Sequence, residues 1–192
     1  MKEVFVKSVE ELEKWLTKNG EQKESVWLVH YKFSTKLSNL TRDNLVDALL
    51  CYGWIDSVPG KVDETKTKIR ISPRRPKSIW SKVNVGKVER LIKQKKMKIS
   101  GLKLVSEAKA DGRWGKAYEG RSKMKVPEDF LKILNKKENK KAKDFYKILN
   151  KTNLYSIGFR LSQVKDLDKR EISIVKIVEQ LNKGIHFHKS KK

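Results

Sequence analysis

The sequence predicts an α+β fold, with a small N-terminal sheet and its helices followed by a helical second half. Residues 26–31 (VWLVHY) form an apolar run rich in β-branched and aromatic residues, which is typical of a buried strand. From Ser81 onward, apolar residues recur three and four positions apart, as on one face of a helix. Five tryptophans, six phenylalanines and five tyrosines supply a core, although charged residues make up 36% of the chain. We therefore expect a folded protein of 192 residues.

The first 53 residues predict two strands and two helices. A short strand is expected at Val4–Val6, and Ser8 then begins a helix, with Glu11 completing a capping box. After the strand at 26–31, Thr41 caps a second helix, which Gly53 ends. One face of that helix is apolar and carries Leu45, Ala48, Leu49 and Tyr52.

Two further strands and a turn complete the predicted sheet. Trp54–Val58 and Lys68–Ile71 are short strand candidates, and the Pro-Gly pair at 59–60 predicts the turn between them. A helix with Val85, Val88 and Ile92 on one face follows, and Ser100–Gly101 predicts a break after it.

The rest of the chain divides by its apolar spacing. A helix carrying Leu104, Val105 and Ala108 ends at Asp111–Gly112, which places an α+β core at residues 1–112. Residues 113–126 are expected to be an irregular connection. Residues 127–184 are expected to be a C-terminal helical domain that begins at Pro127. Residues 185–192 are expected to be a mobile tail.

Charge is distributed unevenly along the chain. The formal net charge is +23, yet residues 1–60 hold 8 Lys/Arg against 9 Asp/Glu. Between Thr65 and Lys103 there are 14 basic residues and a single acid, Glu89. Such a field attracts nucleic acid or anionic ligands, and it is equally compatible with a solvated lysine-rich surface that has no partner.

The segment from Cys51 to Asn84 contains the candidate site. It combines two tryptophans, one carboxylate, two adjacent arginines and several small polar side chains in a loop-rich stretch, and its candidate ligand-binding residues are Trp54, Asp56, Arg74, Arg75, Trp80, Ser81 and Asn84. A buried carboxylate needs a cationic partner, so Asp56 is expected to pair with Arg74 or Arg75. That pair is either a structural clamp or part of an anion-binding pocket beside the helix that Ser81 or Ser78 caps.

Other reactive residues do not predict a catalytic centre. His30 lies in the expected strand and Cys51 in an apolar helix, so both are interpreted as core residues. His186 and His188 lack further ligands nearby in the sequence, so no metal is expected. The sequence contains no phosphate-binding glycine loop, nucleophile elbow or HExxH motif. We therefore expect no cofactor and favour a non-enzymatic function, with Asp56 as an acid or base the remaining alternative.

The compartment is inferred from three sequence features. No apolar run approaches the roughly 20 residues that span a bilayer, and the N-terminus has no apolar segment typical of a secretory signal. The chain has one cysteine, which excludes an internal disulfide. We expect a cytoplasmic protein.

Several blocks of the sequence resemble the YdeI/OmpD-associated, or bacteriocin-protection, family. They include CYGWIDS at 51–57, SPRRPKSIWSKVN at 72–84, VPEDF at 126–130, NLYSIGF at 153–159 and KREISIVKIVEQL at 169–181. The resemblance implies a link to tolerance of cationic antimicrobial peptides and to an outer-membrane porin, without an established reaction.

Two functions follow as alternatives. The first is a non-enzymatic stress or bacteriocin-protection protein that binds a small anionic ligand or a protein partner around Trp54–Asn84. The second is a protein that binds nucleic acid weakly and non-specifically through residues 65–103, with tryptophans as stacking groups.

Overall fold

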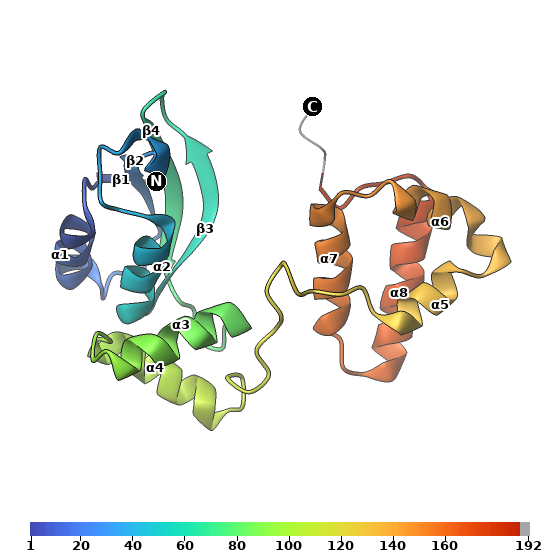
Figure 1. Ribbon diagram of the computed structural model, residues 1–192. Helices are drawn as coiled ribbons and strands as arrows, with labels where there is room; N and C mark the ends of the chain where they lie inside the picture. Colours follow the sequence, from blue (N-terminus) through green and yellow to red (C-terminus); the bar gives the residue numbers. More distant parts are fainter. Residues whose placement is uncertain (189–192) are drawn as a thin grey trace. The chain divides into compact units, whose positions relative to one another are not determined.

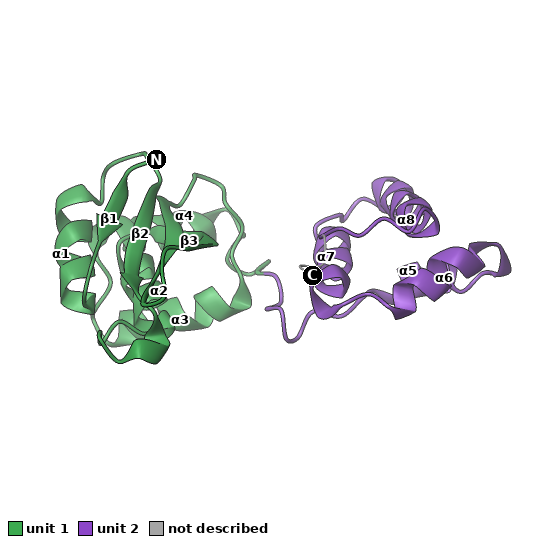
Figure 2. Cartoon of the chain, turned by 90° about the horizontal axis from the view of Figure 1, so that it is seen from above, with its two compact units in different colours: residues 1–117 green, residues 118–192 purple. Residues whose placement is uncertain are grey.

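A computed structural model describes residues 1–188 and divides the chain into two compact units, residues 1–117 and residues 118–192 (Figures 1 and 2). Each unit has its own cluster of buried apolar side chains. The N-terminal unit contains a four-stranded sheet and the C-terminal unit is helical, so the predicted α+β class is confirmed.

The sheet of the N-terminal unit has the strand order β1-β2-β4-β3. Strand β1 pairs with β2 in parallel, and the other two pairs are antiparallel. The elements of this unit are β1 (Glu3–Phe5), α1 (Val9–Asn19), β2 (Val26–Tyr31), the 3-10 turn η1 (Phe33–Thr35), α2 (Arg42–Cys51), β3 (Trp54–Lys61), β4 (Lys66–Pro73), α3 (Lys82–Lys93) and α4 (Ile99–Ala110).

Helix boundaries follow the capping residues that the sequence contains. The Ser8 side chain accepts a hydrogen bond from the Glu11 amide at the start of α1. Thr41 and Asn44 form a reciprocal capping box at the start of α2. Gly53 lies between the end of α2 and the start of β3. Its φ of 78° is a conformation that glycine adopts without strain.

The predicted turn at Pro59–Gly60 is wrong, because both residues lie within β3. The register of β3 against β4 shifts between Asp56 and Pro59, and β3 is an edge strand of the sheet. An edge strand with a bulge tolerates a proline that lacks an amide donor. The turn lies instead at Asp63, whose side chain accepts hydrogen bonds from the amides of Thr65 and Lys66.

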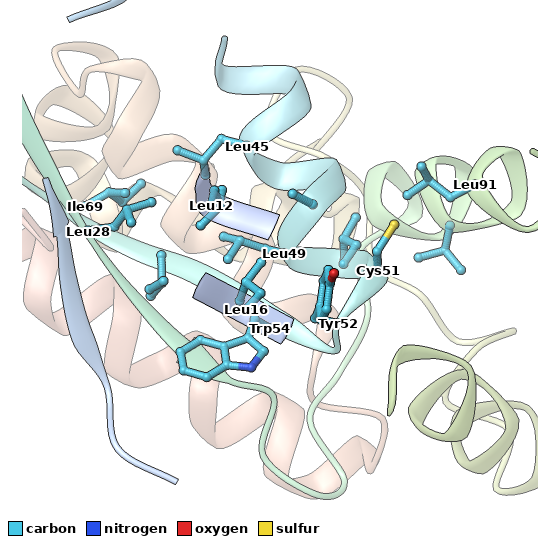
Figure 3. Close-up of a cluster of buried hydrophobic side chains, with 14 of the residues drawn as sticks. Leu12, Leu16, Leu28, Leu45, Leu49, Cys51, Tyr52, Trp54, Ile69 and Leu91 are labelled. Atoms are coloured by element: carbon cyan, nitrogen blue, oxygen red, sulfur yellow. The ribbon is translucent and has the colours of Figure 1, made fainter. Parts of the chain in front are cut away.

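Helices α1 and α2 cover one face of the sheet with leucines. Figure 3 shows Leu12 and Leu16 of α1 near Leu45 and Leu49 of α2, and all four are at most 1% exposed. Trp54 is fully buried in the same cluster. Cys51 lies at the end of α2, and burial raises the pKa of its thiol to about 11, so it is an inert core residue at neutral pH.

Gly101 lies inside α4 rather than at a helix break. A β-carbon at this position would lie 2.3 Å from the Cys51 carbonyl oxygen and 2.9 Å from that of Leu50. The Lys98 amide also donates to the Cys51 carbonyl oxygen, at 3.0 Å. Gly101 therefore allows close contact between α4 and the end of α2, and the break lies between α3 and α4.

The C-terminal unit packs its helices around one apolar cluster. Its elements are α5 (Glu128–Leu134), the 3-10 turn η2 (Lys137–Asn139), α6 (Lys140–Lys147), α7 (Lys151–Ser162) and α8 (Leu167–Asn182). Phe130, Ile157, Leu161 and Leu181 are fully buried in that cluster.

Arg170 connects three helices of this unit. Its guanidinium forms two hydrogen bonds with the Asp129 carboxylate at the start of α5. It also donates to the carbonyl oxygens of Leu161 and Val164, at 2.6 and 3.2 Å, at and just beyond the end of α7. The hydrogen bond from Arg170 lowers the pKa of the Asp129 carboxyl, so the pair stays ionised at neutral pH.

The segment after α8 makes specific contacts up to residue 188. The Arg160 guanidinium lies 4.5 Å from the ring centroid of Phe187, and the His188 amide donates to the Asn153 side chain at 3.0 Å. The Ser156 hydroxyl lies 2.7 Å from the His188 ring. Phe187 and His188 thus pack on α7 where we expected a mobile tail, and residues 189–192 of that expectation lie outside the described residues.

Candidate functional site

The centre of the candidate site is the guanidinium of Arg74 stacked on the indole of Trp80. The Arg74 carbon Cζ lies 3.7 Å from the ring centroid, and both residues are largely buried, at 6% and 2% exposed. Arg74 also donates to the Ile79 carbonyl oxygen at 2.8 Å, and its amide donates to the Gly53 carbonyl oxygen at 2.9 Å. The stack and the bond to Ile79 hold the guanidinium in one orientation.

Trp80 has a second aromatic neighbour and an unpaired donor. Its ring packs edge-on against Trp114, with centroids 4.9 Å apart. The indole Nε1 of Trp80 is buried and has no hydrogen-bond partner among the described residues. An unpaired buried donor costs about 1–3 kcal/mol, so this N–H is a position where an acceptor from a ligand or partner would be stabilising.

Ser81 and Asn84 form the N-terminus of α3 next to this stack. The Ser81 side chain accepts a hydrogen bond from the Asn84 amide at 3.2 Å, which confirms Ser81 as the cap. Arg75 is exposed, and Lys77 adopts a φ of 61° within the loop that joins β4 to α3. The loop therefore presents the Arg75 guanidinium just ahead of a helix start, while that of Arg74 is buried against Trp80.

The predicted ion pair between Asp56 and Arg74 or Arg75 is wrong. The Asp56 carboxylate pairs instead with Arg42 in the first turn of α2, at 2.6 Å. Helix α2 packs against β3, whereas the Arg74 side chain is turned onto Trp80. The Arg42 side chain is 59% exposed, so this pair contributes no more than about 1 kcal/mol to stability.

Trp54 belongs to the core of the N-terminal unit. Its indole Nε1 donates to the Gly20 carbonyl oxygen at 3.1 Å, and its ring packs edge-on against Trp15. The structure thus brings together Arg74, Trp80, Ser81 and Asn84. The indole N–H of Trp54 has its partner at the end of α1, and the carboxylate of Asp56 has its partner on α2.

The sequence analysis missed two residues that support the site, Arg113 and Trp114. The Arg113 guanidinium donates to the Ser78 carbonyl oxygen at 2.8 Å and pairs with Asp111 at 2.7 Å. Both residues lie in the segment interpreted as an irregular connection, 30 or more positions from the loop they contact. The one signal in the sequence was the tryptophan of the Arg113–Trp114 pair, a large apolar residue in a region with few others.

Metal-ligating clusters and membrane-spanning helices are both absent from the described residues. Within residues 1–188, no cluster of three His, Cys, Asp or Glu side chains is arranged to hold a metal ion. Among the described helices, none has the length and apolar character to cross a membrane.

Comparison with known proteins assigns the two parts of the chain to two family models. Residues 4–104 match the family described as Domain of unknown function (DUF8412). Residues 123–184 match the family described as Bacteriocin-protection, YdeI or OmpD-Associated. No curated protein and no solved structure matches the chain. The resemblance stated from the sequence is confirmed through residues 123–184, while the Arg74–Trp80 site lies within the first family match.

Proposed function

Since this chain belongs to the family described as Domain of unknown function (DUF8412) and carries a YdeI/OmpD-associated domain at residues 123–184, we propose that it is a non-enzymatic protection protein that binds an anionic group through the N-terminal unit. The anionic group belongs to a small ligand or to a protein partner. The description of the second family supports a role in bacteriocin protection.

One observation carries this proposal, the unpaired Nε1 of Trp80 beneath the guanidinium of Arg74. Both groups are hydrogen-bond donors. Both side chains are buried and stacked on each other, which fixes the positions of the donors. A phosphate, sulfate or carboxylate offers several acceptor oxygens and a negative charge. The start of α3 and the exposed Arg75 add positive potential to the same loop.

We expect the binding to be mainly electrostatic and to be strengthened where water is excluded from the charged groups. The ring of Trp80 excludes water from one side of the guanidinium, which strengthens its attraction to an anion. The stacked guanidinium and the Trp80 N–H are both hydrogen-bond donors, so the proposal is one of binding.

Thermal unfolding in the presence of phosphate or sulfate tests this function. At constant ionic strength set with chloride, the melting temperature of the wild-type protein should rise with phosphate concentration, because an anion that binds only the folded state stabilises it by RT ln(1 + [L]/Kd). Arg74→Lys keeps the charge but loses the planar stack, and it should reduce the rise.

The control is Lys109→Ala, which removes a cation that lies 5.5 Å from the ring of Trp114 without touching the guanidinium. This variant should keep the full phosphate response. A response that is unchanged in Arg74→Lys, or no response in the wild-type protein, would show that the Arg74–Trp80 stack is only scaffold.

A further inference from the structure

The sheet of the N-terminal unit has a second face, opposite the leucines of α1 and α2. Side chains alternate between the two faces of a strand, so the cross-strand pairs Val26–Ile71 and Leu28–Ile69 are buried while the pairs between them point the other way. On that other side, Trp27 lies opposite Arg70 and Tyr31 lies opposite Lys66. We call this surface the lysine–aromatic face; it consists of Phe5, Trp27, Tyr31, Lys66, Lys68 and Arg70.

Aromatic rings and cations alternate across this face. The Lys66 ammonium lies 5.3 Å from the ring centroid of Phe5, and the Lys68 ammonium lies 5.1 Å from that of Trp27. Phe5 and Tyr31 pack edge-on with centroids 5.5 Å apart. Phe5 is 42% exposed, and Trp27 and Tyr31 are partly exposed, so these rings remain accessible to solvent.

Residues of β3 border this face. Gly60 of β3 lies beside Lys68 and Trp27, where an added β-carbon would come within 3.0 Å of the lysine side chain. Arg70 is oriented by a hydrogen bond from its Nε to the Ser57 hydroxyl at 3.0 Å. One carboxylate opposes an anion here, since Glu3 pairs with Lys68 at 2.6 Å.

We propose that the lysine–aromatic face binds single-stranded nucleic acid. Exposed rings in a sheet are stacking surfaces for unpaired bases, and every base offers a π-face, so the binding needs no sequence specificity. The cations beside the rings neutralise the phosphates that follow each base. A base that stacks on Phe5 or Trp27 takes the place of the ammonium, which moves to the adjoining phosphate.

The pattern favours a single strand over a duplex. Bases in a duplex are stacked on one another and expose no faces to a protein ring. A sheet with exposed aromatic residues accommodates about two or three unpaired bases. This surface is separate from the Arg74–Trp80 site in its residues, so the proposal goes beyond the proposed function and stands without it.

Anisotropy of a labelled single-stranded oligonucleotide tests the proposal on the full chain, with the matching duplex as competitor. The wild-type protein should prefer the single strand. Phe5→Leu and Tyr31→Leu keep apolar size but lose a ring, and each should weaken single-strand binding about tenfold. Duplex binding should change little, because it depends on charge alone. Phe33→Leu removes a ring that is 45% exposed and stacked on His30, outside the face, and should have no effect.

The charges give an independent readout. Lys68→Ala should reduce the slope of log affinity against log salt by about 0.7, the value for one phosphate on a single strand. Glu3→Gln should strengthen binding about two- to fivefold, because it removes the opposing carboxylate and releases Lys68. Phe5 and Tyr31 pack on each other, so a readout without substitutions is also needed. Ultraviolet crosslinking of the wild-type protein should place the oligonucleotide on peptides that contain Phe5, Trp27 or Tyr31.

The proposal is overturned by any of three results. These are equal or tighter binding of the duplex, equal losses in Phe5→Leu and Phe33→Leu, or crosslinks confined to peptides outside the face. Each would mean that the net charge of +23, rather than this surface, attracts the nucleic acid.

Discussion

At the scale of single residues, the site depends on which side chains contact each other. The residues of the site were easier to predict from the sequence than the pairs they form. Arg74 and Trp80 stood out because arginine and tryptophan rarely alternate in a proline-rich loop. The partner of Asp56 is Arg42, which is 14 positions away and nearer in sequence than Arg74, but which lies on α2, and only the packing of α2 against β3 brings the two side chains together. The two adjacent arginines of the proline-rich loop directed the expectation to Arg74 or Arg75, yet the planar guanidinium of Arg74 has its stacking partner in Trp80.

His30 gives a prediction on pH at this scale. It is 2% exposed, its Nδ1 lies 2.7 Å from the Tyr31 carbonyl oxygen, and burial lowers its pKa below the ordinary value of 6.5. The unfolded chain therefore binds a proton more readily than the folded protein as the pH falls below about 6.5.

Stability should thus be lost on acidification, by at most about 1.4 kcal/mol per pH unit from this residue. Chemical denaturation at pH 7 and pH 5 measures the loss. His30→Gln should lose less stability than the wild-type protein over the same interval, because glutamine does not titrate. Equal losses in both proteins would mean that His30 does not contribute.

At the scale of elements, local signals predicted the types of helix and strand, but tertiary contacts decided two positions that those signals misjudged. Pro59–Gly60 and Ser100–Gly101 both resemble chain breaks in sequence. In the structure, Pro59 occupies an edge strand beside a bulge, and Gly101 is required by the carbonyl oxygens of α2. The lysine–aromatic face was missed for a related reason. The apolar run at 26–31 suggested burial on both sides, whereas Trp27 and Tyr31 are only partly buried.

Two glycines in neighbouring helices provide a matched prediction. Gly101→Ala should destabilise the N-terminal unit by about 1–3 kcal/mol, because its β-carbon would meet backbone oxygens that cannot move without separating α2 from α4. Gly86 lies in α3 with no atom within 4 Å of an added β-carbon. Gly86→Ala should leave stability unchanged or raise it by up to about 1 kcal/mol, because alanine favours the helix. Urea denaturation compares the two. Equal effects would contradict the close contact at Gly101.

At the scale of the whole molecule, the chain combines two compact units that match two different families. The α+β class was predictable because strand-like and helix-like periodicity occupy separate halves of the sequence. The surfaces proposed for binding were only partly predictable, since each assembles residues from several elements. Positive charge after residue 60 was compatible with an anionic partner, and the two surfaces proposed for such a partner lie around Trp80 and on the sheet.

The most direct test of the Arg74–Trp80 site is calorimetric titration of phosphate into the wild-type protein and into Trp80→Phe, at constant ionic strength. Phenylalanine keeps an aromatic surface for Arg74 but lacks the unpaired N–H. Loss of one hydrogen bond to a charged ligand should weaken binding about tenfold or more. In the absence of phosphate, Trp80→Phe should retain a cooperative thermal transition, which shows that the fold is intact. Phosphate affinity that is the same in both proteins would contradict the account.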